Sequence, residues 1–334
     1  MKKRLLAAIS IAALATAPLA ACGESGPSIT VYNAQHQQLL DEVVPIFEKE
    51  TGIDVKLRNG KDLELANQLV QEGSASPADV FLTENSPAMS LVDSKGLFAP
   101  VPTKVLSQIP DEYVASDKNW LGFLARSTVL FYNTDQVKPA DLPASILDLA
   151  EPEWKGKVAF SPTGADFQAI VSAVLQLKGE QATADWLAGL KANGTVYDGN
   201  NLVLKAVNDG EKQVGIAYHY YWYRDQKESG ENSNRSQPYF FTKQDPGAFV
   251  SVSGAGMLKS SKHKAEAEKF LDFLVSEKGQ QAIADSYALE YPLNPKVSLD
   301  PSVKAFDELQ PPKVDISKLN SPDVVKLMQD AGLL

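Results

Sequence analysis

Short hydrophobic runs alternate with longer amphipathic stretches along the chain. Residues 29–32 predict a strand. The next stretch predicts a helix that ends at Thr51-Gly52, because apolar side chains recur there at helical spacing: Leu39, Leu40, Val43, Val44 and Phe47. Strands are then predicted at 53–57 and 78–82, and helices at 63–70 and 88–92. This alternation of strands and helices is typical of the α/β fold class.

The same rhythm continues through the middle of the chain, where residues 158–160 and 214–217 predict strands. Near the end, an amphipathic helix is predicted to close at Gly279, from the spacing of Ala267, Phe270, Leu271, Leu274 and Val275. Residues 291–295, Tyr-Pro-Leu-Asn-Pro, predict a break in all regular structure. With 334 residues, of which 44% are hydrophobic, the chain is long enough for two domains.

The first residues predict export. A basic start at residues 1–4 precedes an apolar run at 5–17 that is too short for a comfortable membrane span, so residues 1–21 are predicted to be a signal peptide. The sequence Leu-Ala-Ala-Cys that ends at Cys22 resembles a bacterial lipobox and predicts lipidation of Cys22. The alternative is an incidental small residue near a cleavage site. Residues 22–27 predict a short tether to the outer face of the cytoplasmic membrane.

Charge and cysteine content exclude several classes of function. The formal net charge is −10, and loss of the basic leader makes the mature chain more acidic, which argues against a nucleic-acid partner. Cys22 is the only cysteine, so internal disulfides, cysteine-rich zinc sites and iron–sulfur clusters are excluded. Because there is no Ser-His-Asp order, Walker loop or His-Glu-x-x-His helix, hydrolase and nucleotide chemistry lack support.

Polar side chains follow several predicted strands at the point where a helix is about to begin. His36 follows 29–32, Glu84 follows 78–82, Thr163-Gly164-Ala165-Asp166 follows 158–160, and a tyrosine-rich stretch follows 214–217. Ligands of open α/β sheets bind outside the carboxyl ends of the strands. The sequence therefore predicts that these positions line one cleft.

The tyrosine-rich stretch is Tyr-His-Tyr-Tyr-Trp-Tyr-Arg at 218–224. Adjacent side chains on a regular strand point to opposite faces, so Tyr220 and Tyr221 can share a ligand only at a turn or a helix start. A phenol in water loses its proton only near pH ~10, so two neighbouring tyrosinates require a strong cation. Ferric iron is such a cation, and it prefers oxygen donors with imidazole acceptable.

His36, Glu84, Tyr220 and Tyr221 would supply one nitrogen and three anionic oxygens, whose charge balances Fe³⁺. Water or a small anion would take the remaining coordination positions of the metal, and backbone N–H groups of residues 163–165 could hold that anion. A purely structural role remains an alternative for each of these residues. The tyrosines could form an aromatic core edge, His36 could be structural or solvated, and Glu84 could satisfy a helix start.

Four further residues are predicted to have structural or surface roles rather than a role in binding. Tyr218 and Tyr223 are predicted to pack, His219 to be structural, and His263 to lie in a solvated charged turn.

Several segments resemble the bacterial periplasmic ferric-ion-binding proteins, the solute receptors of ferric ABC importers. The paired-tyrosine segment 219–223 is the most specific of them. The others are Tyr-Asn-Ala-Gln-His at 32–36, Pro-Ala-Asp-Val-Phe at 77–81, Ala-Arg-Ser-Thr-Val-Leu-Phe-Tyr-Asn at 125–133, the 291–295 segment, and Val-Asp-Ile-Ser-Lys-Leu at 314–319.

The resemblance implies a two-lobed periplasmic-binding-protein clamshell with crossovers near residues 127 and 250. The first lobe would comprise 28–126 and 251–302 and carry His36 and Glu84. The second would comprise 127–250 and 303–334 and carry Tyr220 and Tyr221. An anion such as carbonate or phosphate would bind on the second lobe, at Thr163, Gly164, Ala165 and Asn200, with Arg126 nearby. Gly164 and Tyr218 depart from residues common in the family, which leaves the identity of the anion open.

The predicted function is that of a monomeric, lipid-anchored receptor that captures Fe³⁺ and delivers it to an ABC importer permease, without catalysis. One alternative keeps the fold and changes the cargo to an oxyanion, a polyamine or a chelated metal. The other is a non-haem iron enzyme, against which stands the scarcity of histidines near the tyrosines.

Overall fold

The structure, a computed structural model, describes residues 26–319 and 322–334. The predicted signal peptide at 1–21, the predicted lipidation at Cys22 and most of the predicted tether lie outside the described residues. Within the described ranges, no helix has both the length and the apolar character needed to cross a membrane.

The strands are β1 (Ser28–Asn33), β2 (Asp54–Asn59), β3 (Val80–Leu82), β4 (Leu121–Asn133), β5 (Val158–Phe160), β6 (Gly194–Val196), β7 (Val214–Tyr218), β8 (Ser236–Tyr239), β9 (Val250–Met257) and β10 (Tyr291–Pro292). The α-helices are α1 (Gln37–Thr51), α2 (Asp62–Glu72), α3 (Ser86–Ser94), α4 (Thr103–Leu106), α5 (Ala165–Lys178), α6 (Glu180–Asn193), α7 (Asn200–Asn208), α8 (Tyr220–Glu228), α9 (Lys264–Val275), α10 (Glu277–Asp285) and α11 (Pro322–Asp330).

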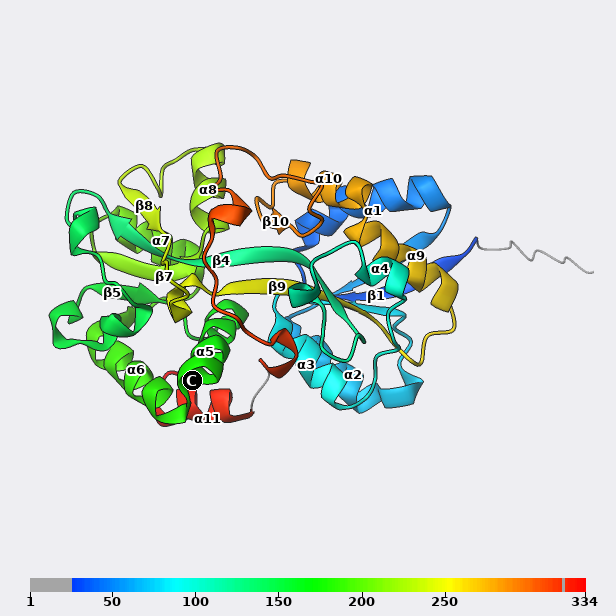
Figure 1. Cartoon of the computed structure of the whole chain (residues 1–334), viewed down its shortest axis with the longest axis horizontal. Coiled ribbons are helices and arrows are strands. Elements are labelled where there is room, and N and C mark those ends of the chain that lie inside the picture. Colours follow the sequence, from blue (N-terminus) through cyan, green and yellow to red (C-terminus); the bar gives the residue numbers. More distant parts are fainter. Residues whose placement is uncertain (1–25, 320–321) are drawn as a thin grey trace, which may run out of the picture.

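Two lobes lie side by side, and β4 and β9 run between them (Figure 1). In the first lobe, β2, β1 and β3 are parallel and β9 is antiparallel to β3. In the second lobe, β5 is parallel to β6 and β7, while β7 and β8 are antiparallel to β4. Helices cover both faces of each sheet, with α1, α9 and α10 opposite α2 and α3 in the first lobe (Figure 1).

Strand β4 passes from one sheet to the other. Its pairing with β9 extends to Ser127 opposite Val250, and its pairing with β7 begins at Thr128 opposite Tyr218. The change of partner along β4 falls between Ser127 and Thr128, close to the crossover predicted near residue 127. Because a hydrogen-bonded strand continues through the boundary, the two lobes share one backbone element at their junction.

Local patterns predicted much of this structure. Helix α1 buries the five predicted apolar side chains, and Gly52 follows it with a φ of 68°, a left-handed conformation that glycine adopts without a steric cost. Strand β5 has the predicted bounds, and β7 extends one residue beyond them.

Two predictions near the end of the chain were wrong. The helix predicted to close at Gly279 ends at Val275, and Gly279 lies inside α10, where its N–H donates to the Ser276 hydroxyl that caps the helix. A side chain at Gly279 would collide with the carbonyl oxygen of Phe273, so the glycine permits close packing rather than ending a helix. Within 291–295, Tyr291 and Pro292 form β10, which pairs with β4.

Candidate metal centre between the lobes

Helix α8 begins immediately after β7, so Tyr220 and Tyr221 occupy its first two positions. This is the helix start that the sequence predicted, and its helical backbone lets the adjacent rings stack with centroids 4.2 Å apart. The Tyr220 hydroxyl donates to Oε1 of Glu84 at 3.3 Å, and the Tyr221 hydroxyl donates to Oδ2 of Asp166 at 3.1 Å. Both phenols therefore point at carboxylates.

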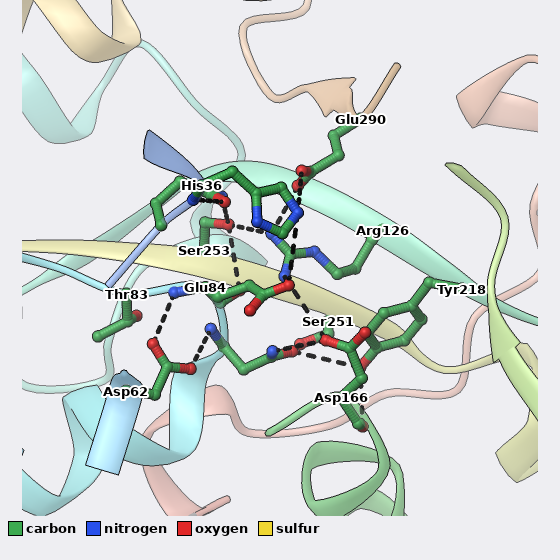
Figure 2. Close-up of polar contacts among 12 residues, drawn as sticks. His36, Asp62, Thr83, Glu84, Arg126, Asp166, Tyr218, Ser251, Ser253 and Glu290 are labelled. Carbon is green, nitrogen blue, oxygen red and sulfur yellow. Dashed lines mark hydrogen bonds and ion pairs between the residues drawn. The ribbon is translucent and has the colours of Figure 1, made fainter. Parts of the chain in front are cut away.

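His36 and Glu84 come from the first lobe. Glu84 lies between β3 and α3, and its N–H donates to Oδ1 of Asp62 at 2.8 Å, which fixes the turn (Figure 2). His36 precedes α1, and its Nε2 lies 3.6 Å from Oε1 of Glu84. The imidazole is 5.8 Å from the Tyr220 ring. The structure thus gathers His36, Glu84, Tyr220 and Tyr221 into one cluster.

Asp166 is a buried carboxylate that the sequence analysis placed along the predicted cleft without giving its side chain a role in binding. It lies in the first turn of α5, where it accepts hydrogen bonds from the side-chain amides of Asn85 at 2.9 Å and Asn200 at 2.8 Å, besides that from Tyr221. The signal was present, because Asp166 ends the Thr-Gly-Ala-Asp segment. Only the backbone N–H groups of that segment were considered, and the acidic side chain was overlooked.

The residues predicted to hold an anion lie around this carboxylate. Thr163, Gly164 and Ala165 lead into α5, with Gly164 at its N-cap, and Asn200 begins α7. The amide of Asn200 donates to Asp166 rather than pointing at open space. In this conformation, the Asp166 carboxyl group lies next to Tyr221 and accepts a hydrogen bond from its hydroxyl.

Arg126 is fully buried on β4 at the crossover, between three carboxylates (Figure 2). Its Nη2 lies 2.5 Å from Oε2 of Glu290, and its Nη1 lies 3.5 Å from Oε1 of Glu84 and 4.0 Å from Oδ1 of Asp166. Glu290 was also missed by the sequence analysis. It lies in an irregular stretch before β10, where no periodic pattern marks it.

Burial dominates the electrostatics of the cluster. It raises the pKa of Glu84, and it raises the pKa of Asp166 to about 7, with a further contribution from the charge of Glu84. The pKa values of Tyr220 and Tyr221 lie well above the usual 10, because of burial and the nearby charge of Asp166. Burial lowers the pKa of His36 to about 4, so its imidazole is neutral at pH 7. Without a bound cation, the protein therefore favours the neutral, protonated forms of these two carboxyl groups and two phenols.

A cation would reverse that balance, because it favours the ionised form of every surrounding oxygen. Across 26–319 and 322–334, the His, Cys, Asp and Glu side chains make no group of three or more that could hold a metal on their own. The Tyr220 and Tyr221 phenols lie beside the carboxylates of this cluster. Carboxylate, phenolate and one imidazole are donors suited to a hard, highly charged ion.

The remaining singled-out residues have structural contacts. His219 is buried, its Nδ1 accepts from the N–H of Ser127 at 3.2 Å, and its ring stacks on Tyr291. His263 is half exposed and lies 3.2 Å from Oδ1 of Asp79. Tyr223 accepts from the N–H of Lys304. Tyr218 does more than pack, since its hydroxyl lies 3.3 Å from Oδ1 of Asn85 and so joins the network around Asp166.

Two sheets joined by two antiparallel strands, with a charged cluster between the lobes, define a two-lobed binding protein. Residues 26–281 match the family described as bacterial extracellular solute-binding protein. The chain is 51% identical, over all of both chains, to the Fe(3+)-binding periplasmic protein of Serratia marcescens. It is 38% identical to the major ferric iron-binding protein of Neisseria meningitidis serogroup B, over 96% of this chain and 98% of that one.

Comparison with solved structures points to the same group of proteins. Iron-bound HitA from Pseudomonas aeruginosa superposes with a TM-score of 0.86 at 42% identity, over 92% of this chain and all of that one. The chain belongs to the bacterial extracellular solute-binding protein family, and its resemblance to the ferric-ion-binding proteins is confirmed. The predicted two-lobed α/β fold is likewise confirmed. These relatives are named as binding proteins rather than enzymes, which supports the prediction of a non-catalytic receptor.

Proposed function

We propose that the protein captures Fe³⁺ between its lobes. The ligands are His36 and Glu84 from the first lobe and Tyr220 and Tyr221 from the second, with Asp166 as a further oxygen donor. The observation that carries this proposal is that both phenol hydroxyls donate to carboxylates, Glu84 and Asp166, within one buried cluster. A trivalent cation would replace the two phenol protons and draw these oxygens together. The names of the relatives support iron as the cargo.

The proposal is tested by titrating iron-stripped protein with Fe³⁺ and recording the visible spectrum. A tyrosinate-to-iron charge-transfer band should rise to a stoichiometry of one ion per chain, and it should be absent from the Tyr220→Phe, Tyr221→Phe double variant. Tyr223→Phe is the matched control on the same helix, because Tyr223 contacts Lys304 rather than the cluster. A band that survives in the double variant, or no band in any of the proteins, would refute the site.

We propose further that Asp166 fills the position that the sequence analysis gave to an anion such as carbonate or phosphate. Asn200, one of the predicted anion contacts, already donates to Asp166, and Arg126 lies 4.0 Å from it. Free anions would then be accessory rather than required. A relative from Trichodesmium was solved in complex with iron and citrate, at 27% identity and a TM-score of 0.82, over 92% of this chain and all of that one. The titration therefore includes carbonate, phosphate and citrate as separate arms, and citrate dependence would favour a chelated cargo.

The lobes are proposed to comprise 28–126 with 251–302 and 127–250 with 303–334. Residues 303–334 contact both lobes. The Ser90 hydroxyl of the first lobe donates to the carbonyl oxygen of Ile316. Further along the chain, α11 packs against α5 and α6 of the second lobe. Parting of the lobes would separate His36 and Glu84 from the tyrosines and release iron to an ABC importer permease. Uptake of radioactive iron into vesicles that contain the permease would test this delivery.

Export and anchoring complete the proposal. Residues 1–21 would be removed, and lipid on Cys22 would hold the monomeric receptor at the outer face of the cytoplasmic membrane through the tether at 22–27. Intact-mass measurement of the protein from its native membrane tests this step. A diacylglyceryl mass that is lost in Cys22→Ala supports the anchor, whereas an unmodified soluble chain contradicts it.

A further inference from the structure

Arg224 is a second, partly buried arginine beside the cluster, and it is not one of the proposed iron ligands. It follows Tyr220 by four positions on α8, so both side chains lie on one face of the helix. The guanidinium lies over the Tyr220 ring, 4.3 Å from its centroid. Its side chain is only 15% exposed.

The other contacts of Arg224 all lie in one short segment of the first lobe, at residues 287–290. The guanidinium lies 4.4 Å from the centroid of the Tyr287 ring. Its Nε donates to the carbonyl oxygen of Ala288 at 2.9 Å, and its Nη2 lies 3.6 Å from Oε1 of Glu290. One side chain from the second lobe therefore makes a ring contact, a hydrogen bond and an ion pair with the first.

The segment that receives Arg224 is itself constrained. Leu289 has a φ of 52°, a left-handed conformation that is costly for a branched side chain. Its neighbour Glu290 is fully buried and already paired with Arg126, so it stays compensated when Arg224 departs. The segment thus presents a ring, a carbonyl oxygen and a carboxylate in an arrangement that matches a planar guanidinium.

We propose that Arg224 is the clasp that holds the lobes closed, and that it positions Tyr220 while it does so. Opening would break the contacts with Tyr287, Ala288 and Glu290 together and leave the contact with Tyr220, because only Tyr220 is on the same lobe. The clasp therefore sets the lifetime of the closed state, whereas the ligand side chains set the chemistry of binding. As a device for iron retention, this inference rests on the proposed function.

Lysine cannot replace this arginine fully. Its ammonium is a point charge that can pair with Glu290, but it cannot present a flat surface to two rings while also donating to Ala288. Arg224→Lys should therefore retain part of the clasp, and Arg224→Ala should lose it. Arg235→Ala is the matched control, since Arg235 pairs with Asp135 at an exposed position within the second lobe.

The test measures iron release into excess chelator by stopped-flow absorption, together with the radius of gyration from small-angle X-ray scattering. Release from Arg224→Ala should be at least about tenfold faster than from the wild type, with Arg224→Lys intermediate and the association rate within about twofold. Scattering should show a larger radius for Arg224→Ala. A release rate and a radius that both match the wild type, or equal effects in Arg235→Ala, would overturn the clasp.

Failure of the proposed function would look different. If the wild type develops no tyrosinate band, iron binding fails while the scattering comparison still decides the clasp. A larger radius of gyration for Arg224→Ala than for Arg224→Lys would then support the clasp. Identical radii of gyration in all variants would overturn the clasp. Arg224→Lys keeps the charge at this buried position, which guards against a variant that simply does not fold.

Discussion

Asn85 and Asp166 join the two lobes through a hydrogen bond of 2.9 Å between residues 81 positions apart in the chain. Asn85 precedes α3 and Asp166 lies in the first turn of α5, so the starts of these two helices lie close together between the lobes. The amide orientation is set by its oxygen, which accepts from Ser251 at 2.8 Å and from Tyr218 at 3.3 Å. The amide nitrogen is thereby directed at Asp166.

Replacing Asp166 with asparagine should weaken Fe³⁺ binding by about 10- to 100-fold, because the site loses an anionic oxygen beside Tyr221. Phosphate or carbonate should restore part of the affinity by supplying the negative charge that the substitution removes. Competition against nitrilotriacetate, with and without each anion, measures both effects. Asp209→Asn is the control, since that carboxylate pairs with Lys205 at the surface. An unchanged affinity in both conditions would contradict a role for Asp166.

Iron binding should release about two protons per ion between pH 7.5 and 8, one from each phenol. Tyr220 and Tyr221 stay protonated in the metal-free protein because their pKa values are raised. His36, with its pKa lowered to about 4, is already neutral and releases none. Below about pH 7 the release should increase, as Asp166 also holds its proton.

Calorimetry in buffers of different ionisation enthalpy counts these protons. The Tyr220→Phe, Tyr221→Phe variant should release none from this source. In Asp166→Asn, which lacks the carboxyl that titrates near pH 7, an increase in proton release that remains near pH 6.5 would contradict the lowered pKa of His36.

A second pH effect is expected far from the cluster. Burial, followed by a hydrogen bond with Asp117, raises the pKa of Asp93 to about 6 from the usual 3.8. A raised carboxyl pKa stabilises the fold fully below about pH 3.8, and this contribution is lost as the pH rises through 6. Asp117→Asn should therefore flatten the fall in melting temperature between pH 4 and 7. The exposed Asp141→Asn should leave it unchanged, and parallel profiles in all three proteins would refute the coupling.

Gly279→Ala should destabilise the protein by about 1–3 kcal/mol, because the new methyl group meets the carbonyl oxygen of Phe273 and the backbone must move. Helix propensity alone predicts the opposite sign, a gain of about 1 kcal/mol. Urea unfolding distinguishes the two. Gln281→Ala, at an exposed position of the same helix, is the control and should change the unfolding midpoint little. A more stable Gly279→Ala would show that the close approach relaxes freely.

The predictable parts of the fold are those that depend on residues close together in the sequence. Helical spacing located α1 and α9, and the adjacency of Tyr220 and Tyr221 required a helix start, which α8 provides. The error at Gly279 has the same origin. A glycine after an apolar helical pattern is typical of a helix end, and nothing local reveals the carbonyl oxygen of Phe273 beneath it.

The unpredicted site residues share another property. Asp166, Glu290 and Arg224 take their roles from partners far away in the chain, such as Asn85 for Asp166 and Ala288 for Arg224. Glu290 and Arg224 carry no periodic signal, whereas Asp166 was marked only by its place after a predicted strand. Their burial and pairing could be seen only once the lobes were placed together.

The sequence by itself determined the chemistry that is available: two adjacent phenols, one histidine and one glutamate at strand ends, in a chain with a single cysteine. It also determined many of the helices and strands, such as α1 and β5, because side-chain periodicity is a local property. Only the tertiary structure decided which charges meet, because it places Asp166 against Tyr221 and Arg224 against Glu290. Electrostatic energy depends on distance and burial, and both are set by the fold rather than by order along the chain.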